Sequence, residues 1–139
     1  MSKIVLDTNI LISALIKSGT PRDLVFELIE KKVKLILSME ILQEFIESVG
    51  EPKIKRYIDE EDLSNFIKII GAISKIVRIK SKFKIIKQDP DDDILLRTAY
   101  DGRANYLVSG DAHLLNLKKF KRIKIVSIKE MLEILRIKD

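Results

Sequence analysis

Short apolar segments alternate with longer amphipathic segments along this chain of 139 residues. Runs of four or five residues rich in Ile, Val and Leu predict strands at 3–6, 34–37, 105–109 and 123–127. Between them, apolar residues recur at the three-to-four-residue spacing of helices. Because parallel strands need a crossover between them, this order predicts an α/β fold: a three-layer α/β/α sandwich with a central, mainly parallel sheet. We expect residues 1–139 to form a single domain.

Capping signals indicate where several helices begin. Thr20 and Pro21 precede one periodic segment, and Ser38 precedes another, which suits the preferences of the N-cap and the first turn. Residues 60–74 predict a further helix. Residues 76–87 alternate too weakly to be assigned.

The composition excludes several classes of protein and site. Apolar residues make up 46% and charged residues 34%, which is typical of a globular protein rather than a disordered one. The absence of cysteine excludes disulfides and thiolate metal sites. There is neither a glycine-rich phosphate loop nor an uncharged stretch of about 20 residues that could span a bilayer. The chain passes almost directly into its first apolar run, so we expect no signal peptide and a cytoplasmic location.

Basic residues exceed acidic ones, 26 against 21, and they are unevenly distributed. Seven of them, and no acid, lie between Phe66 and Gln88. Such a run is often only a solvated face, but clustered Lys and Arg also attract nucleic acid. Four lysines from this run are the candidates for RNA binding: Lys80, Lys82, Lys84 and Lys87.

Acidic residues follow the predicted strands. Asp7 comes directly after the first strand, and Asp111 follows the strand at 105–109. Glu44 lies on the helix after the second strand, and the acids at 91–93 begin the helix that leads to the third. Since ligands of open α/β sheets collect outside the carboxyl ends of the strands, these four acidic positions map to one edge.

Helix capping explains each acid singly but not the group. Asp7 and Asp111 suit N-caps, Glu44 suits a helix surface, and Asp89 with Pro90 suits a helix start. A further carboxylate at 91–93 adds repulsion that a cation would relieve. Oxygen ligands, in a chain with one histidine and no cysteine, favour Mg²⁺ or Mn²⁺ over Zn²⁺. Such ions beside basic stripes indicate metal-assisted hydrolysis of phosphodiesters.

Three stretches carry a family resemblance: "IVLDTNILISAL", "SMEILQEF" and "DPDDDILLRTAYDGRANYLVSGDAHLLNL". Together they resemble the PIN domain family, and in particular its small prokaryotic members that act as toxins of toxin–antitoxin systems. The resemblance runs from about Lys3 to Ser127, which is nearly the whole chain. The first and third stretches are highly specific in combination, whereas the second is weak alone.

The resemblance implies roles for particular residues. Four acidic residues would hold one or two Mg²⁺ or Mn²⁺ ions: Asp7, Glu44, Asp93 and Asp111. Asn9 and Ser109 would be polar supports that orient them, although threonine is frequent in the family where this chain has Ser109. The run of acids leaves it open whether Asp91 or Asp92 shares the third ligand role.

The resemblance also implies an activity and partners. It implies an endoribonuclease that prefers single-stranded RNA, forms a homodimer and is silenced by an antitoxin. The main alternative is a catalytically inactive PIN-like domain that binds RNA or protein, but all four acidic positions are filled here. A receiver domain fits less well, because Leu6 replaces one of its paired acids and Lys129 lies at a helix start.

Overall fold

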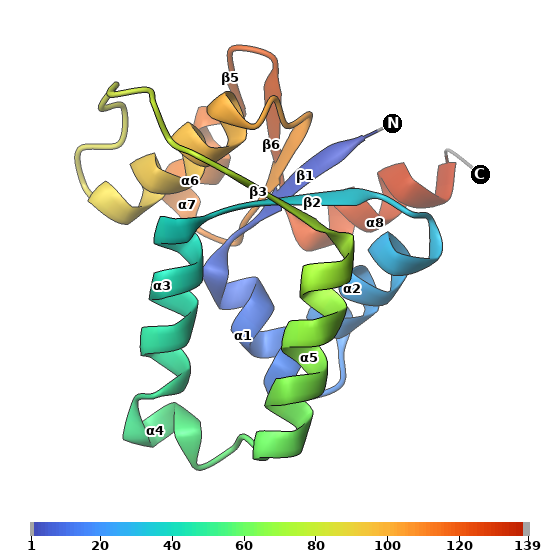
Figure 1. Cartoon of the computed structure of the whole chain (residues 1–139). Coiled ribbons are helices and arrows are strands. Elements are labelled where there is room, and N and C mark those ends of the chain that lie inside the picture. The colour runs from blue at the N-terminus through green and yellow to red at the C-terminus, as the bar shows by residue number, and fades with distance from the viewer. Residues whose placement is uncertain (1, 138–139) are drawn as a thin grey trace.

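A computed structural model describes residues 2–137 (Figure 1). Its strands are β1 (Lys3–Leu6), β2 (Lys34–Ser38), β3 (Ser74–Val77), β4 (Tyr106–Val108), β5 (Lys119–Phe120) and β6 (Ile123–Val126). They form one sheet in the order β3-β2-β1-β4-β6-β5. Every neighbouring pair is parallel except β5 and β6, which are antiparallel. The predicted α/β fold with a mainly parallel sheet is therefore confirmed.

Helices connect the strands and cover both faces of the sheet. They are α1 (Thr8–Ile16), α2 (Thr20–Glu30), α3 (Met39–Val49), α4 (Pro52–Lys55), α5 (Glu60–Ile73), α6 (Pro90–Asp101), α7 (Ala112–Leu117) and α8 (Ile128–Ile137). α6 packs against β1, β2 and β4 on one face, while α5 packs against β2 and β3 on the other (Figure 1). α1 contacts α2, α3 and α5, and α2 contacts α8.

The alternation of side chains along β2 shows how the two faces are filled. Leu37 lines a hollow formed with α3 and α5, whereas Ile36 faces the end of α6. There Gly102 follows the helix, and a Cβ atom at this position would clash with the Ile36 side chain and lie 2.9 Å from the Thr98 carbonyl oxygen. The absence of a side chain at Gly102 thus lets α6 end close against the sheet, which fixes the position of its first turn.

Three details differ from the sequence-based assignment. The helix expected over 60–74 ends at Ile73, and Ser74 opens β3 while its hydroxyl donates to the Ile70 carbonyl. Neither α4 nor β5 was expected, because four and two residues are too short to show a periodicity. In the described part of the chain, no helix has both the length and the apolar character needed to cross a membrane.

Candidate functional site

Two neighbouring strands end side by side at the start of the site. Leu6 of β1 lies opposite Val108 of β4, and the Asp7 N–H donates to the Val108 carbonyl oxygen at 2.9 Å. β1 has β2 on one side and β4 on the other, so the strand order reverses at this point. Such a reversal leaves a crevice at the carboxyl ends of the strands. Asp7 and Ser109, the residues that follow the two strands, therefore lie at the same crevice.

Ser109 connects the first and the last acid of the site. Its side chain is fully buried, and its hydroxyl donates to Asp7 Oδ2 at 2.7 Å while accepting the Asp111 N–H at 3.0 Å. A hydrogen bond from a hydroxyl group to a carboxylate is strong and orients both side chains. Asn9 contributes through its backbone N–H, which donates to Asp7 Oδ1 at 3.1 Å, and its side chain is exposed.

Three carboxylates meet where α6 and α7 begin. One oxygen from each of Asp89, Asp92 and Asp111 lies within 4.8 Å of the others. Asp92 is only 4% exposed, and its Oδ2 is buried with no hydrogen-bond partner among the described residues. A buried oxygen of this kind is unfavourable unless something compensates it, and a bound cation is one such partner. Asp89 and Asp92 were not among the expected ligands, although Asp92 had been left open.

The crowding alters the acidity of Asp92. Burial, followed by the negative charges of Asp111, Asp89, Asp7 and Asp91, raises the pKa of the Asp92 carboxyl from 3.8 to about 7. All of these causes disfavour the ionised form. A positive ion at the cluster would act in the opposite direction.

Glu44 belongs to the same electrostatic neighbourhood. It is half-buried on α3, and burial is the largest cause that raises the pKa of its carboxyl. The charges of Asp91, Asp7 and Asp89 come next, followed by that of Glu47. The structure thus brings Glu44 near Asp7 and the acids at the start of α6, although Glu44 is not one of the three carboxylates that meet most closely.

The acids cap helices as well as forming the cluster. Asp7, Asp89 and Asp111 each accept the backbone N–H two residues later through Oδ1, at 3.1, 3.0 and 2.7 Å. They are the N-caps of α1, α6 and α7. In Asp89 and Asp111 capping uses one oxygen and leaves the second for another partner, so helix capping and cation binding are compatible uses of one carboxylate. In Asp7 the second oxygen accepts the Ser109 hydroxyl.

Asp93, which was expected to be the third acid, is not one of the three carboxylates that meet most closely. Its Oδ1 accepts the N–H groups of Ile85 and Ile86 at 2.9 and 3.0 Å. Consecutive helical residues lie about 100° apart around the helix axis, so Asp92 and Asp93 point in different directions. Both side chains are 4% exposed, and Leu96 lies four residues after Asp92 and three after Asp93, so the spacing of buried residues does not distinguish the two acids.

The partner of Asp93 belongs to an extended segment, residues 80–87, which we call the lysine strap. The strap runs alongside α6 and is held to it at three places spaced four residues apart: Asp93, Arg97 and Asp101. Arg97 donates through Nε and Nη2 to the Phe83 carbonyl oxygen, at 2.8 and 2.6 Å. Residues four apart lie on one helix face, so α6 uses a face other than that of Asp92 to hold the strap.

Asp101 holds the far end of the strap. Its Oδ2 accepts the Lys80 N–H at 3.0 Å, the Ser81 N–H at 3.1 Å and the Ser81 hydroxyl at 2.7 Å. Burial tends to raise the pKa of the Asp101 carboxyl, but these hydrogen bonds and the nearby Lys80 charge outweigh burial and lower the pKa. The backbone of the strap is thus fixed while its lysine side chains are exposed: Lys80, Lys82, Lys84 and Lys87.

Comparison with known proteins gives a consistent result. A family model described as "PIN domain" matches residues 3–113. An uncharacterized protein of Methanocaldococcus jannaschii is 29% identical over 132 residues, which cover 91% of this chain and 84% of that protein. Among solved structures, VapBC2 from Rickettsia felis bound to a promoter DNA fragment matches with a TM-score of 0.61 at 15% identity. That match covers 90% of this chain and 98% of the other.

The raised pKa of Asp92 predicts how stability depends on pH in the absence of metal. The folded protein binds this proton more tightly than the unfolded chain does, because the pKa is about 7 when folded and 3.8 otherwise. The free energy of unfolding should therefore rise as the pH falls from about 8 to about 5. The shift bounds the Asp92 contribution at about 4 kcal/mol. Urea unfolding of the metal-free protein across this range measures it.

Two variants test whether Asp92 causes this pH dependence of stability. Asp92→Asn should stabilise the metal-free protein at about pH 8 and flatten the pH dependence, because the titrating group is gone. Asp93→Asn removes the same charge one residue away and should keep the slope. An unchanged slope in Asp92→Asn would contradict the assignment.

Proposed function

The chain belongs to the PIN domain family, and from this premise we propose that it is a Mg²⁺- or Mn²⁺-dependent endoribonuclease that hydrolyses RNA phosphodiesters. The observation that carries the proposal is that three carboxylate oxygens lie within 4.8 Å of one another at the strand-order reversal. One of these carboxylates belongs to the buried Asp92, whose Oδ2 has no hydrogen-bond partner among the described residues. Members of this family are generally nucleases, and their chemistry uses acidic residues grouped in this way.

The residues present fit a hard divalent cation. Asp89, Asp92 and Asp111 offer oxygen ligands at one point, and the unpaired Asp92 Oδ2 is the atom that lacks a partner without an ion. The Asp7 charge raises the pKa of Asp92 and of Glu44, so both Asp7 and Glu44 lie near the cluster and would complete the site for one or two ions. Carboxylate oxygens suit Mg²⁺ and Mn²⁺. A cation held there supplies Lewis-acid stabilisation of the charge that develops on the reacting phosphodiester.

Side chains and helix caps of the protein orient the acids of the site. Ser109 holds the Asp7 carboxylate and the Asp111 backbone in fixed relation, so these two acids are oriented before a ligand arrives. Helix caps fix Asp7, Asp89 and Asp111 in the same manner. The acids need no protein nucleophile beside them, because metal-assisted hydrolysis uses water for the attack.

The lysine strap supports RNA as the substrate. It offers four exposed lysines on a backbone that is fixed to α6, and its later part adjoins Asp93, the neighbour of Asp92. Lysines in a row neutralise successive phosphates, and the site reads the backbone rather than the base sequence. We infer a preference for single-stranded RNA, encountered in the cytoplasm.

An apolar groove supports a protein partner. Between α3 and α5 lies a hollow of about 290 Å³, which we call the α3–α5 groove; among its lining residues are Leu42, Phe45, Ile46, Phe66, Ile67, Ile70 and Ile76. Ile46, Ile67 and Ile76 are half exposed or more. A groove between two helices fits the apolar face of a third helix. Because the chain resembles the PIN domain toxins of toxin–antitoxin systems and its fold matches that of VapBC2, we propose that it is a toxin and that its antitoxin fills the groove. A homodimer remains a prediction.

Three single variants test the proposed nuclease. Asp7→Asn and Asp92→Asn should lower Mn²⁺-dependent cleavage of labelled single-stranded RNA by about 100-fold or more, because each weakens the site directly. Asp93→Asn should lower it by less than about tenfold, since that carboxylate holds the strap. Mn²⁺ at about 100 times its Kd should stabilise the wild type and Asp93→Asn by roughly 2.7 kcal/mol, and Asp92→Asn by much less.

The same experiment separates the alternatives. An Asp92→Asn variant that cleaves normally beside an inactive Asp93→Asn would restore Asp93 as the third ligand. A wild type that neither cleaves RNA nor responds to Mn²⁺ would favour a catalytically inactive PIN-like domain that binds RNA or protein. Asp7→Asn, purified in the same way, controls for a contaminating nuclease.

The groove predicts which variant loses the antitoxin. The product of the adjacent reading frame should copurify with the wild type and suppress its RNA cleavage. Ile67→Glu places a charge in the groove and should abolish copurification while leaving cleavage intact. Ile69→Glu, on the same helix but outside the groove, is the matched control. If Ile67→Glu retains the partner, the groove is not its site; if this variant instead turns a wild-type dimer into a monomer, the groove binds a second copy.

A further inference from the structure

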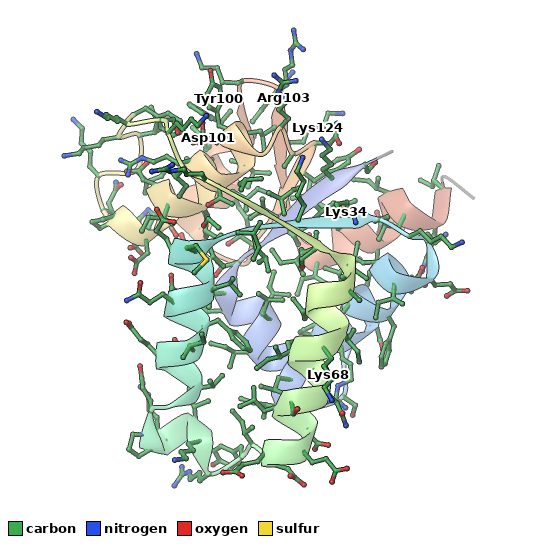
Figure 2. All side chains as sticks on the ribbon, in the orientation of Figure 1. Lys34, Lys68, Tyr100, Asp101, Arg103 and Lys124 are labelled. Carbon is green, nitrogen blue, oxygen red and sulfur yellow. The ribbon has the colours of Figure 1, made fainter. Side chains whose placement is uncertain are left out.

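A second hollow lies at the opposite end of α6 from the acidic cluster. Its volume is about 710 Å³, and it is formed by the last turn of α6, the turn before β4 and the β5–β6 hairpin. We call it the far-edge cavity; its polar and aromatic lining includes Tyr100, Asp101, Arg103, Asn105, Lys121 and Arg122. Figure 2 shows Tyr100, Asp101 and Arg103 grouped at the end of α6, away from α3 and α5.

The charge of the far-edge cavity is positive. Arg103, Lys121 and Arg122 are exposed, and none of them is paired with an acid in the ion pairs found among residues 2–137. Asp101 is the one carboxylate in the lining, and its Oδ2 is engaged by three donors of the strap. The cavity therefore presents three cations without a carboxylate partner among the described residues, and the Lys121 ammonium lies 5.9 Å from the centroid of the Phe120 ring.

The backbone at two of these positions favours other residues. Arg103 and Lys121 both have φ of 55°, in the left-handed region that glycine and asparagine adopt more readily. Neither turn needs an arginine or a lysine for its geometry. Either residue can therefore be replaced by asparagine, which suits this backbone conformation.

An aromatic surface adjoins these cations. Tyr100 is 46% exposed, and its ring packs edge-on against Phe83 of the strap at 5.7 Å between centroids. Phe120 of β5 packs against both rings, at 4.8 Å from Phe83 and 6.4 Å from Tyr100. Exposed aromatic rings beside basic side chains are the combination that binds single-stranded nucleic acid, through base stacking and phosphate contacts.

We propose that the far-edge cavity is an anchoring site for single-stranded RNA, separate from the site of cleavage. Arg103, Lys121 and Arg122 would contact phosphates, and Tyr100 would contact a base. The 12 residues of α6 separate the two sites by about 18 Å, and the lysine strap spans this interval from Lys80 at the cavity end. The proposal rests on the proposed ribonuclease function and adds to it a second contact that only a longer strand can reach.

The left-handed positions offer a variant that keeps the fold. Arg103→Asn/Lys121→Asn removes two charges and places a residue that suits the backbone, so its unfolding transition should not fall below that of the wild type. The matched control is Lys32→Asn/Lys118→Asn, which removes two charges at the other two left-handed non-glycine positions, neither of which lines the cavity. Arg122→Gln tests the same cavity without any change in turn preference.

The measurement is the fluorescence anisotropy of a labelled single-stranded RNA of about 16 nucleotides, without metal, at several salt concentrations. Two lost phosphate contacts should lower the slope of log affinity against log salt by about 1.4 in the cavity variant. The control variant should keep the wild-type slope. With Mn²⁺, the cavity variant should cleave the long RNA less efficiently, through a higher KM, and cleave an RNA of about four nucleotides at the wild-type rate.

The outcomes distinguish the proposed anchoring site from the proposed ribonuclease function on which it rests. If the wild type cleaves RNA while the cavity and control variants share the wild-type slope, the anchoring site is refuted and the ribonuclease stands. An equal decrease of the salt slope in the cavity and control variants would also refute the anchoring site, because the decrease would then follow from the net charge alone. If the wild type neither binds nor cleaves RNA, the ribonuclease proposal fails.

Discussion

Several carboxylates are crowded at the first turn of α6, and hydrogen bonds to backbone N–H groups make this crowding tolerable. Asp89 and Asp111 each give one oxygen to a helix start, and Asp7 does so while also receiving the Ser109 hydroxyl. These donors offset part of the repulsion, but they do not reach Asp92 Oδ2. The arrangement is therefore incomplete in one defined respect, since Asp92 Oδ2 has no hydrogen-bond partner among residues 2–137.

Two different faces of α6 serve two parts of the site. One face turns Asp92 into the crevice, and another holds the lysine strap through Asp93, Arg97 and Asp101. A single rigid helix thereby fixes both the acids proposed to bind metal and the lysines proposed to bind RNA. Because Asp92 and Asp93 are adjacent, a change in the path of the strap would be transmitted to the acidic cluster through one peptide unit.

Much of this could be predicted from the sequence, because apolar periodicity and capping residues are local signals. Asp7 and Asp111 were placed at one edge from the order of strands alone. The contacts of Asp93 could not be predicted, because its partners are the N–H groups of Ile85 and Ile86, in a segment with no periodicity of its own. Where that segment runs is set by tertiary contacts. The short β5 and α4 were missed because so few residues carry no repeating pattern.

The central claim is that Asp92, and not Asp93, is the acid whose charge state a cation controls. A ¹³C NMR titration of the assigned Asp92 side-chain carboxyl tests it directly. In the metal-free protein the midpoint should lie near pH 7, and saturating Mg²⁺ should move it to lower pH, because metal binding favours the ionised form. A midpoint near the ordinary value of 3.8, unmoved by Mg²⁺, would contradict the account.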